Sequence, residues 1–453
     1  MRVPCVLVSL CVLLGAFAAR AEEPSAPLAR SGRFRPRLSL VDVPFNVRHG
    51  APSMRQAADM QELVMGGGSW AIDLLGERIG QNSRSWVRPV VEVPLLLTWA
   101  LLGATVLPGG DAWFHEEWHR AVLSRHGVSS FNGVYELRLF SEFIYVKHVS
   151  DEGLTFIKEQ HPQDFVRLSA AGMEAQVASN VRLQRDIFYD RRSPARDVPR
   201  LWLNAVSVFQ YLRLCVGTRS EDALGDDVRE VDIAERDFTG LDCSGWIYDL
   251  ENDRQPYAER GVHPSGIGVD RYRYADQLSP EGRSYLKRAS WLSLLNFASP
   301  QLFGVGHLPV PGRPEDRWSF ALSHQLTSFG QVVDGHLLAS LAGWNVGATY
   351  HHYLNGTRAF PGLELRLVRW PVPTQAVSAH LSAEGWLWLQ PSDGRFMDTR
   401  ARLGGGGSLA LAVDVLPRLA VYAELDAKSA GWVTGNVYLG SAVQGRLGLE
   451  AAL

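Results

Sequence analysis

The chain has 453 residues, 46% hydrophobic and 21% charged, so it is long enough to bury a full hydrophobic core and to divide into two regions. Its formal net charge is -3. Without a basic excess to neutralise phosphates, the composition argues against nucleic acid as a partner.

The first 21 residues have the organisation of a secretory signal peptide. Arg2 supplies a positive charge, residues 6–18 are apolar, and the sequence ARA at 19–21 fits a small-x-small cleavage site. We therefore expect residues 1–21 to be removed and the protein to be exported. The expected location is a bacterial-type cell envelope, in the outer membrane or the periplasm.

Export bears on the four cysteines. Cys5 and Cys11 would leave with the signal peptide, and Cys215 and Cys243 would remain in an oxidising compartment. Two outcomes stay open, one disulfide bond or two unlinked buried thiols, because sequence does not show whether the two Cα atoms approach each other.

Helical signals follow an extended leader that is rich in proline, arginine and serine. An apolar helix is expected to be buried, because it is shorter than the roughly 20 residues of a membrane span. A β-hairpin is expected around a turn, and a later aspartate-containing segment, DFTGLDCSGWIYDL, is expected to be an ordered loop. The ranges are 22–52 for the leader, 53–80 for a helix broken at Gly66-Gly67-Gly68, 93–108 for the apolar helix, 143–149 and 154–157 for the hairpin strands, 150–153 for the turn, 162–189 and 201–216 for two helices, and 237–250 for the loop.

The sequence GGDAWFHEEWHR at 109–120 contains the pattern H-E-x-x-H on a segment with helical start and stop signals. Asp111 is the expected N-cap, and Gly127 can end the helix. His115 and His119 are four residues apart, so they lie about 40° apart around the helix axis and share one face. Glu116 projects beside that face, where a carboxylate can move a proton.

His115, Glu116 and His119 match the motif of the zincin metallopeptidases, and the chain resembles that family over these five positions. The resemblance implies Zn²⁺ as cofactor, the two histidines as ligands and Glu116 as general base. Val122 and Arg125 exclude the metzincin pattern. The alternative is a surface helix whose polar residues face water.

Glu174 is the expected third zinc ligand, in a gluzincin-like arrangement. It lies in the expected helix 162–189 on a small, apolar face, where an unpaired carboxylate would be costly to bury. A metal ion would satisfy it. The alternatives are an exposed position and an ion pair with an arginine such as Arg167.

From residue 316 the chain alternates apolar and other residues, which predicts six or seven strands of roughly ten residues. Their content of tryptophan and tyrosine, their length and the exported context resemble bacterial outer-membrane β-barrels. Leu453 departs from that resemblance, because many such barrels end in an aromatic residue. Seven strands also do not close an even-numbered barrel unless earlier segments contribute. A soluble antiparallel sheet is the alternative.

These observations predict an α+β protein. A mainly helical zincin-like domain at 53–315 carries the H-E-x-x-H helix and a β-hairpin, and an antiparallel sheet or barrel follows at 316–453. Two functions remain open. One is an exported zinc-dependent hydrolase, a metallopeptidase acting on a peptide or protein and associated with a membrane through the C-terminal β region. The other is a non-catalytic envelope protein resembling an outer-membrane β-barrel, with a structural or partner-binding helical region.

Overall fold

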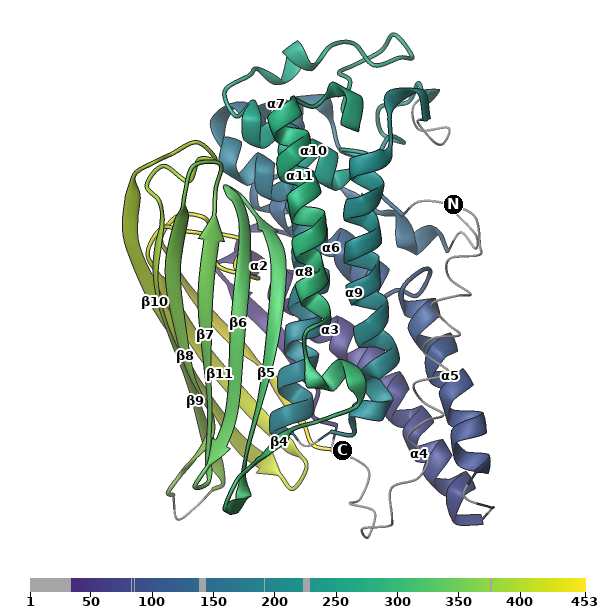
Figure 1. Cartoon of the computed structure of the whole chain (residues 1–453), viewed down its shortest axis with the longest axis vertical. Helices are drawn as coiled ribbons and strands as arrows, with labels where there is room; N and C mark the ends of the chain where they lie inside the picture. Colours follow the sequence, from purple (N-terminus) through teal and green to yellow (C-terminus); the bar gives the residue numbers. More distant parts are fainter. Residues whose placement is uncertain are drawn as a thin grey trace.

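The computed structural model describes residues 34–82, 84, 86–137, 144–190, 192–222, 229–374 and 377–453. Helices dominate the N-terminal region, and an antiparallel sheet of ten strands is formed mainly by the C-terminal region (Figure 1). The predicted α+β class is therefore confirmed. The predicted signal peptide, residues 1–21, lies outside the described residues.

One long helix, α8, is central to the helical region, because it packs against four other helices and against the sheet. Its neighbours are α6, α7, α9, α10 and the strands β5 and β6. A proline in its first turn suits a helix start, since that position needs no backbone N–H donor. The helices are α2 (Phe45–Arg48), α3 (Met54–Gln61), α4 (Gly67–Asn82), α5 (Val87–Gly103), α6 (Asp111–Arg125), α7 (Asp151–Gln160), α8 (Pro162–Tyr189), α9 (Pro194–Gly217), α10 (Asp242–Glu251) and α11 (Pro280–Leu292).

The ten-stranded sheet is a run of hairpins to which one N-terminal strand is added. The order is β1-β12-β11-β10-β9-β8-β7-β6-β5-β4, so β1, from the predicted leader, extends the sheet beside β12. The sheet is open, with β1 and β4 as its edges. The strands are β1 (Arg37–Val43), β4 (Leu308–Val310), β5 (Arg313–Thr327), β6 (Gly330–Leu341), β7 (Trp344–Leu354), β8 (Ala359–Val372), β9 (Ala379–Pro391), β10 (Ala401–Leu416), β11 (Leu419–Lys428) and β12 (Ala442–Ala451).

The predicted hairpin is corrected. Ser150 accepts a hydrogen bond from the backbone N–H of Gly153 and caps α7, so residues 154–157 are helical and not a strand. The residues that favour a turn also favour a helix N-cap, which explains the error. The antiparallel pair in this region is β2 (Phe131–Asn132) with β3 (Val146–Lys147).

The predicted break at the three consecutive glycines is also corrected. One π-helical turn, Glu62–Gly66, joins α3 to α4 without an interruption. A Cβ atom at Gly68 would lie 2.2 Å from the side chain of Trp99, so this glycine allows α4 and α5 to pack closely. The segment predicted as a buried apolar helix falls largely in α5. No helix among the described residues is both long and apolar enough to cross a membrane.

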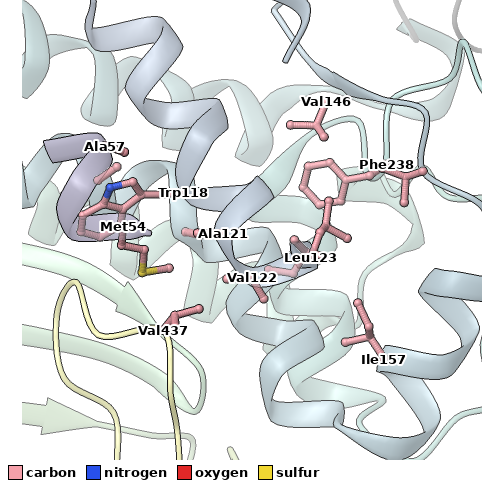
Figure 2. Packing of buried hydrophobic residues seen from close by; sticks show 14 of the residues in the cluster. Met54, Ala57, Trp118, Ala121, Val122, Leu123, Val146, Ile157, Phe238 and Val437 are labelled. Atoms are coloured by element: carbon pink, nitrogen blue, oxygen red, sulfur yellow. The ribbon is translucent and has the colours of Figure 1, made fainter. Parts of the chain in front are cut away.

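Helix α6 is an interior helix, not the surface helix of the alternative interpretation. Buried apolar side chains surround it on more than one side, as Figure 2 shows. It packs mainly against α8 and α3, and it also contacts α5, β2 (Phe131–Asn132) and β3 (Val146–Lys147). The labelled members of this cluster are Met54, Ala57, Trp118, Ala121, Val122, Leu123, Val146, Ile157, Phe238 and Val437. Burying each large apolar side chain stabilises the fold by about 1.5–3 kcal/mol.

Candidate metal centre

Helix α6 brings His115 and His119 together, as predicted. Their ring centroids are 5.0 Å apart, and the His119 residue is 0% exposed. Gly110, rather than Asp111, is the N-cap. Asp111 instead accepts a hydrogen bond from Nε of Arg200 on α9 at 3.0 Å, and this buried ion pair ties the start of α6 to α9.

Helix α8 faces these two histidines with a glycine. A Cβ atom at Gly172 would lie 2.1 Å from Nε2 of His115 and 2.4 Å from Nε2 of His119. Both separations are far below van der Waals contact. A residue with a side chain therefore does not fit at position 172 while the imidazoles keep their places, and the glycine leaves both nitrogens free for another partner.

Asp242 supplies that partner from a third helix. Its Oδ2 atom, at the start of α10, lies 3.0 Å from Nε2 of His115 and 3.2 Å from Nε2 of His119. The donor atoms of the three residues lie within 4.8 Å of one another. Ligand atoms that are each about 2.0–2.1 Å from a tetrahedral zinc ion are about 3.3 Å apart, so this donor set suits zinc.

The orientation of His119 also favours a cation. Its Nδ1 lies 2.5 Å from the backbone carbonyl oxygen of Leu168, to which it donates a hydrogen bond. In the neutral ring this leaves a lone pair on Nε2, which is buried and lies 3.2 Å from Oδ2 of Asp242. That lone pair faces the Asp242 carboxylate, an arrangement that requires a proton or a metal ion. A carbonyl that fixes the ring in this way is typical of metal-binding histidines.

The electrostatics of the three residues agree with a site for positive charge. Burial by itself would raise the pKa of Asp242, but the charge of His119 and hydrogen bonds from both histidines outweigh it and lower the pKa to about 2. Burial lowers the pKa of His115. The pKa of His119 is raised, because Asp242 and the Leu168 carbonyl outweigh the effect of burial. The carboxylate therefore stays ionised and holds one cationic partner.

Two features hold Asp242 in place. Cys243 is bonded to Cys215 of α9, with the two Cα atoms 6.0 Å apart, so the disulfide that was one of two predicted outcomes is present. The backbone N–H of Asp242 donates to the hydroxyl of Tyr211, also on α9, at 3.1 Å. The segment 237–250, expected as a loop, is therefore largely helix α10, anchored to α9 beside the histidines.

Glu116 lies on α6, next to His115, and is 6% exposed. Burial, followed by the charges of Asp242, Asp237 and Glu117, raises its pKa well above the usual value for glutamate. Among the described residues, no hydrogen bond or ion pair joins its carboxyl group to another residue, whereas neighbouring Glu117 accepts a hydrogen bond from Arg120 at 2.5 Å. Of the two, Glu116 is therefore the carboxyl group free to exchange a proton.

Glu174 does not lie in this group, in contrast to its prediction as third ligand, and Asp242 lies beside the histidines in its place. Its Oε1 accepts hydrogen bonds from Nη2 of Arg167 at 2.7 Å and from the backbone N–H of Gly435 at 2.9 Å. Both side chains of this ion pair are fully buried. The carboxylate does have the cationic partner that its burial requires, but that partner is the arginine named as the alternative.

A second group of potential ligands lies beyond the C-terminal end of α6. His126, His161 and Asp164 bring ligand atoms within 4.8 Å of one another. Asp164, however, already accepts a hydrogen bond from Nη1 of Arg125 at 2.7 Å. The guanidinium group repels a further cation, so we regard the group of His115, His119 and Asp242 as the candidate metal centre.

Comparisons with protein-family models, with curated proteins and with solved structures found no match to this chain. The assignment of a function therefore depends on the geometry of the site itself.

Proposed function

We propose that the protein is an exported zinc-dependent hydrolase, and within that class a metallopeptidase. One observation carries the proposal: two imidazole nitrogens of an H-E-x-x-H helix and one carboxylate oxygen from another helix converge, with the oxygen 3.0 Å and 3.2 Å from the two nitrogens. The third ligand is Asp242 in place of the glutamate that the gluzincin resemblance implied.

The residues have separate roles in this proposal. His115, His119 and Asp242 hold the ion, and zinc, when bound, polarises a carbonyl group and makes a water molecule more acidic. Glu116 takes a proton from the attacking water and gives it to the leaving amine. Its pKa is raised by burial and by neighbouring carboxylates, and a dication bound beside it would lower that pKa and so favour the ionised form that accepts a proton.

The disulfide bond supports the exported location. Disulfide bonds persist in oxidising compartments and are rare in the cytosol, where thiols are kept reduced. Cys215 and Cys243 are both buried and bonded to each other. An oxidising environment would thus be needed to keep Asp242 beside the histidines.

Metal analysis and a hydrolysis assay on the same preparation test the proposal. We expect one zinc ion per wild-type chain and cleavage within a library of fluorescence-quenched peptides. Glu116→Gln should keep the zinc and lose about 10²- to 10⁴-fold in rate. Asp242→Asn should lose the zinc itself, because a neutral amide is a poor replacement for an ionised ligand.

Asp164→Asn is the matched control, since it makes the same chemical change in the second His/Asp group. It should leave both the zinc content and the peptide cleavage as they are. A wild-type chain without stoichiometric zinc, or zinc that survives Asp242→Asn and is lost with Asp164→Asn, would overturn the assignment. The first result would favour the non-catalytic envelope protein.

A further inference from the structure

The two faces of the sheet have opposite chemical character. The face turned toward α8 is charged, and it encloses with α8 a cavity of about 380 Å³. Arg366 reaches both Glu364 and Glu384 there, and Arg446 reaches Asp426 at 2.9 Å. These charged side chains therefore point inward, where they are paired.

The outer face, turned away from the helices in Figure 1, is apolar. Alternate residues of strands β7, β9, β10 and β11 point outward, as do those of β8 up to Leu367, where the register shifts, and none of these positions holds Asp, Glu, Lys or Arg. Large side chains at many of these positions are exposed, with Leu365 at 56% and Leu411 at 42%. The most exposed of them are Trp344, Tyr350, Leu363, Leu365, Leu387, Leu403, Leu409, Leu411, Val415 and Leu425, and Val443 and Leu447 continue the surface on β12.

This arrangement is the reverse of a sheet in water. A sheet with one wet face turns apolar residues to the core and polar residues to solvent. Contiguous exposed apolar surfaces larger than several hundred Å² mark a contact with another apolar phase. The rows without charge extend along strands of 10 to 16 residues. Tilted by about 45°, such strands match an apolar band about 25 Å tall.

A second apolar surface, on helix α5, indicates what covers the outer face of the sheet. Helix α5 exposes Val90, Leu95 and Leu102, and it lies on the side of the molecule opposite the sheet (Figure 1). A single partner protein would cover one side. Hydrocarbon chains that surround the molecule would cover both, and they match surfaces on which charge is absent.

We propose that the outer face of strands β7 to β12 lies against the acyl chains of a lipid bilayer. The charged inner face and α8 then form a polar interior that the sheet separates from the hydrocarbon. This proposal is independent of the metal centre, because it depends only on the sheet and on the exposed side of α5.

Vesicle flotation of the full chain tests the proposal. With vesicles of phosphatidylcholine and phosphatidylglycerol, the wild type should float with the lipid and stay bound at high salt, since the contact is apolar. The double variant Leu365→Arg with Leu411→Arg should partition into vesicles about 30-fold less or weaker still. Val262→Arg is the matched control, because Val262 is an apolar residue 70% exposed on a loop outside the sheet, and its variant should float like the wild type.

A second measurement does not depend on the folding of the double variant. Phosphatidylcholine with brominated acyl chains should quench the fluorescence of Trp344 on β7. The contribution of this residue is the difference in quenching between the wild type and Trp344→Phe. A wild type that remains unbound below the vesicles, as a monomer or as a dimer that covers this face, would overturn the proposal. Absence of quenching at Trp344 in floated protein would overturn it as well.

Discussion

Replacing Gly172 by alanine tests the candidate metal centre with a single added carbon. The new Cβ atom would lie 2.1 Å from Nε2 of His115 and 2.4 Å from Nε2 of His119, whereas ordinary contact begins at 3.4 Å. The rings or the helix must then shift by about 1 Å, and a shift of that size costs on the order of a hundredfold in a position-dependent site. We expect Gly172→Ala to bind zinc about a hundredfold more weakly, measured by competition with a chromophoric chelator.

Gly172→Ala should also lower the free energy of unfolding, although alanine favours a helix more than glycine does. Alanine gains about 1 kcal/mol over glycine in an open helix, but overpacking a core costs about 1–3 kcal/mol. Gly67→Ala is the control, because its Cβ atom would meet only Phe34, at 3.7 Å. Chemical denaturation gives both free energies of unfolding. If Gly172→Ala binds zinc as tightly as the wild type and unfolds at the same denaturant concentration, then the two histidines do not converge at this glycine.

Two further predictions concern the residues that support the site. Changing Cys215 and Cys243 together to serine should lower the free energy of unfolding by about 3–4 kcal/mol, as expected for a closed loop with a sequence separation of 28, and should weaken zinc binding through Asp242. Urea titration and chelator competition measure the two effects, and a variant with wild-type zinc affinity would contradict the anchoring role. Glu174→Gln should cost about 3–5 kcal/mol of stability, because it leaves Arg167 buried without its ion-pair partner. The folded fraction should keep its zinc, and loss of zinc at unchanged stability would restore Glu174 as a ligand.

Helices whose ends carry local signals were predictable from the sequence. Pro162 opens α8, and Gly127, with a φ of +71°, follows the end of α6, both as expected. The shared face of His115 and His119 follows from helical geometry alone. Strand alternation likewise predicted most of the sheet, because inward and outward residues differ in character along each strand.

The errors arose where one kind of residue serves two structures. Ser150 favours a turn and a helix N-cap alike, and only its hydrogen bond to Gly153 distinguishes them. Glycines at 66–68 weaken a helix in isolation, yet here Gly68 makes room for Trp99. Strand β1 pairs with β12 at the far end of the chain, and no local pattern shows such a partner.

The prediction of Glu174 as third ligand shows that a buried carboxylate needs a cation, but that this need does not tell which cation it will have. Glu174 lies on the apolar face of α8, where its carboxylate needs a cation. Arg167, two turns earlier on the same helix, supplies that cation, so no metal ion is required there. No arginine in the described part of the chain pairs with Asp242. Its partners are two imidazoles, which can release a proton in exchange for a metal ion, whereas the arginine beside Glu174 keeps its charge. A candidate ligand thus differs from other buried carboxylates in having no permanently charged partner. The sequence does not show this difference, because it arises only when the helices pack together.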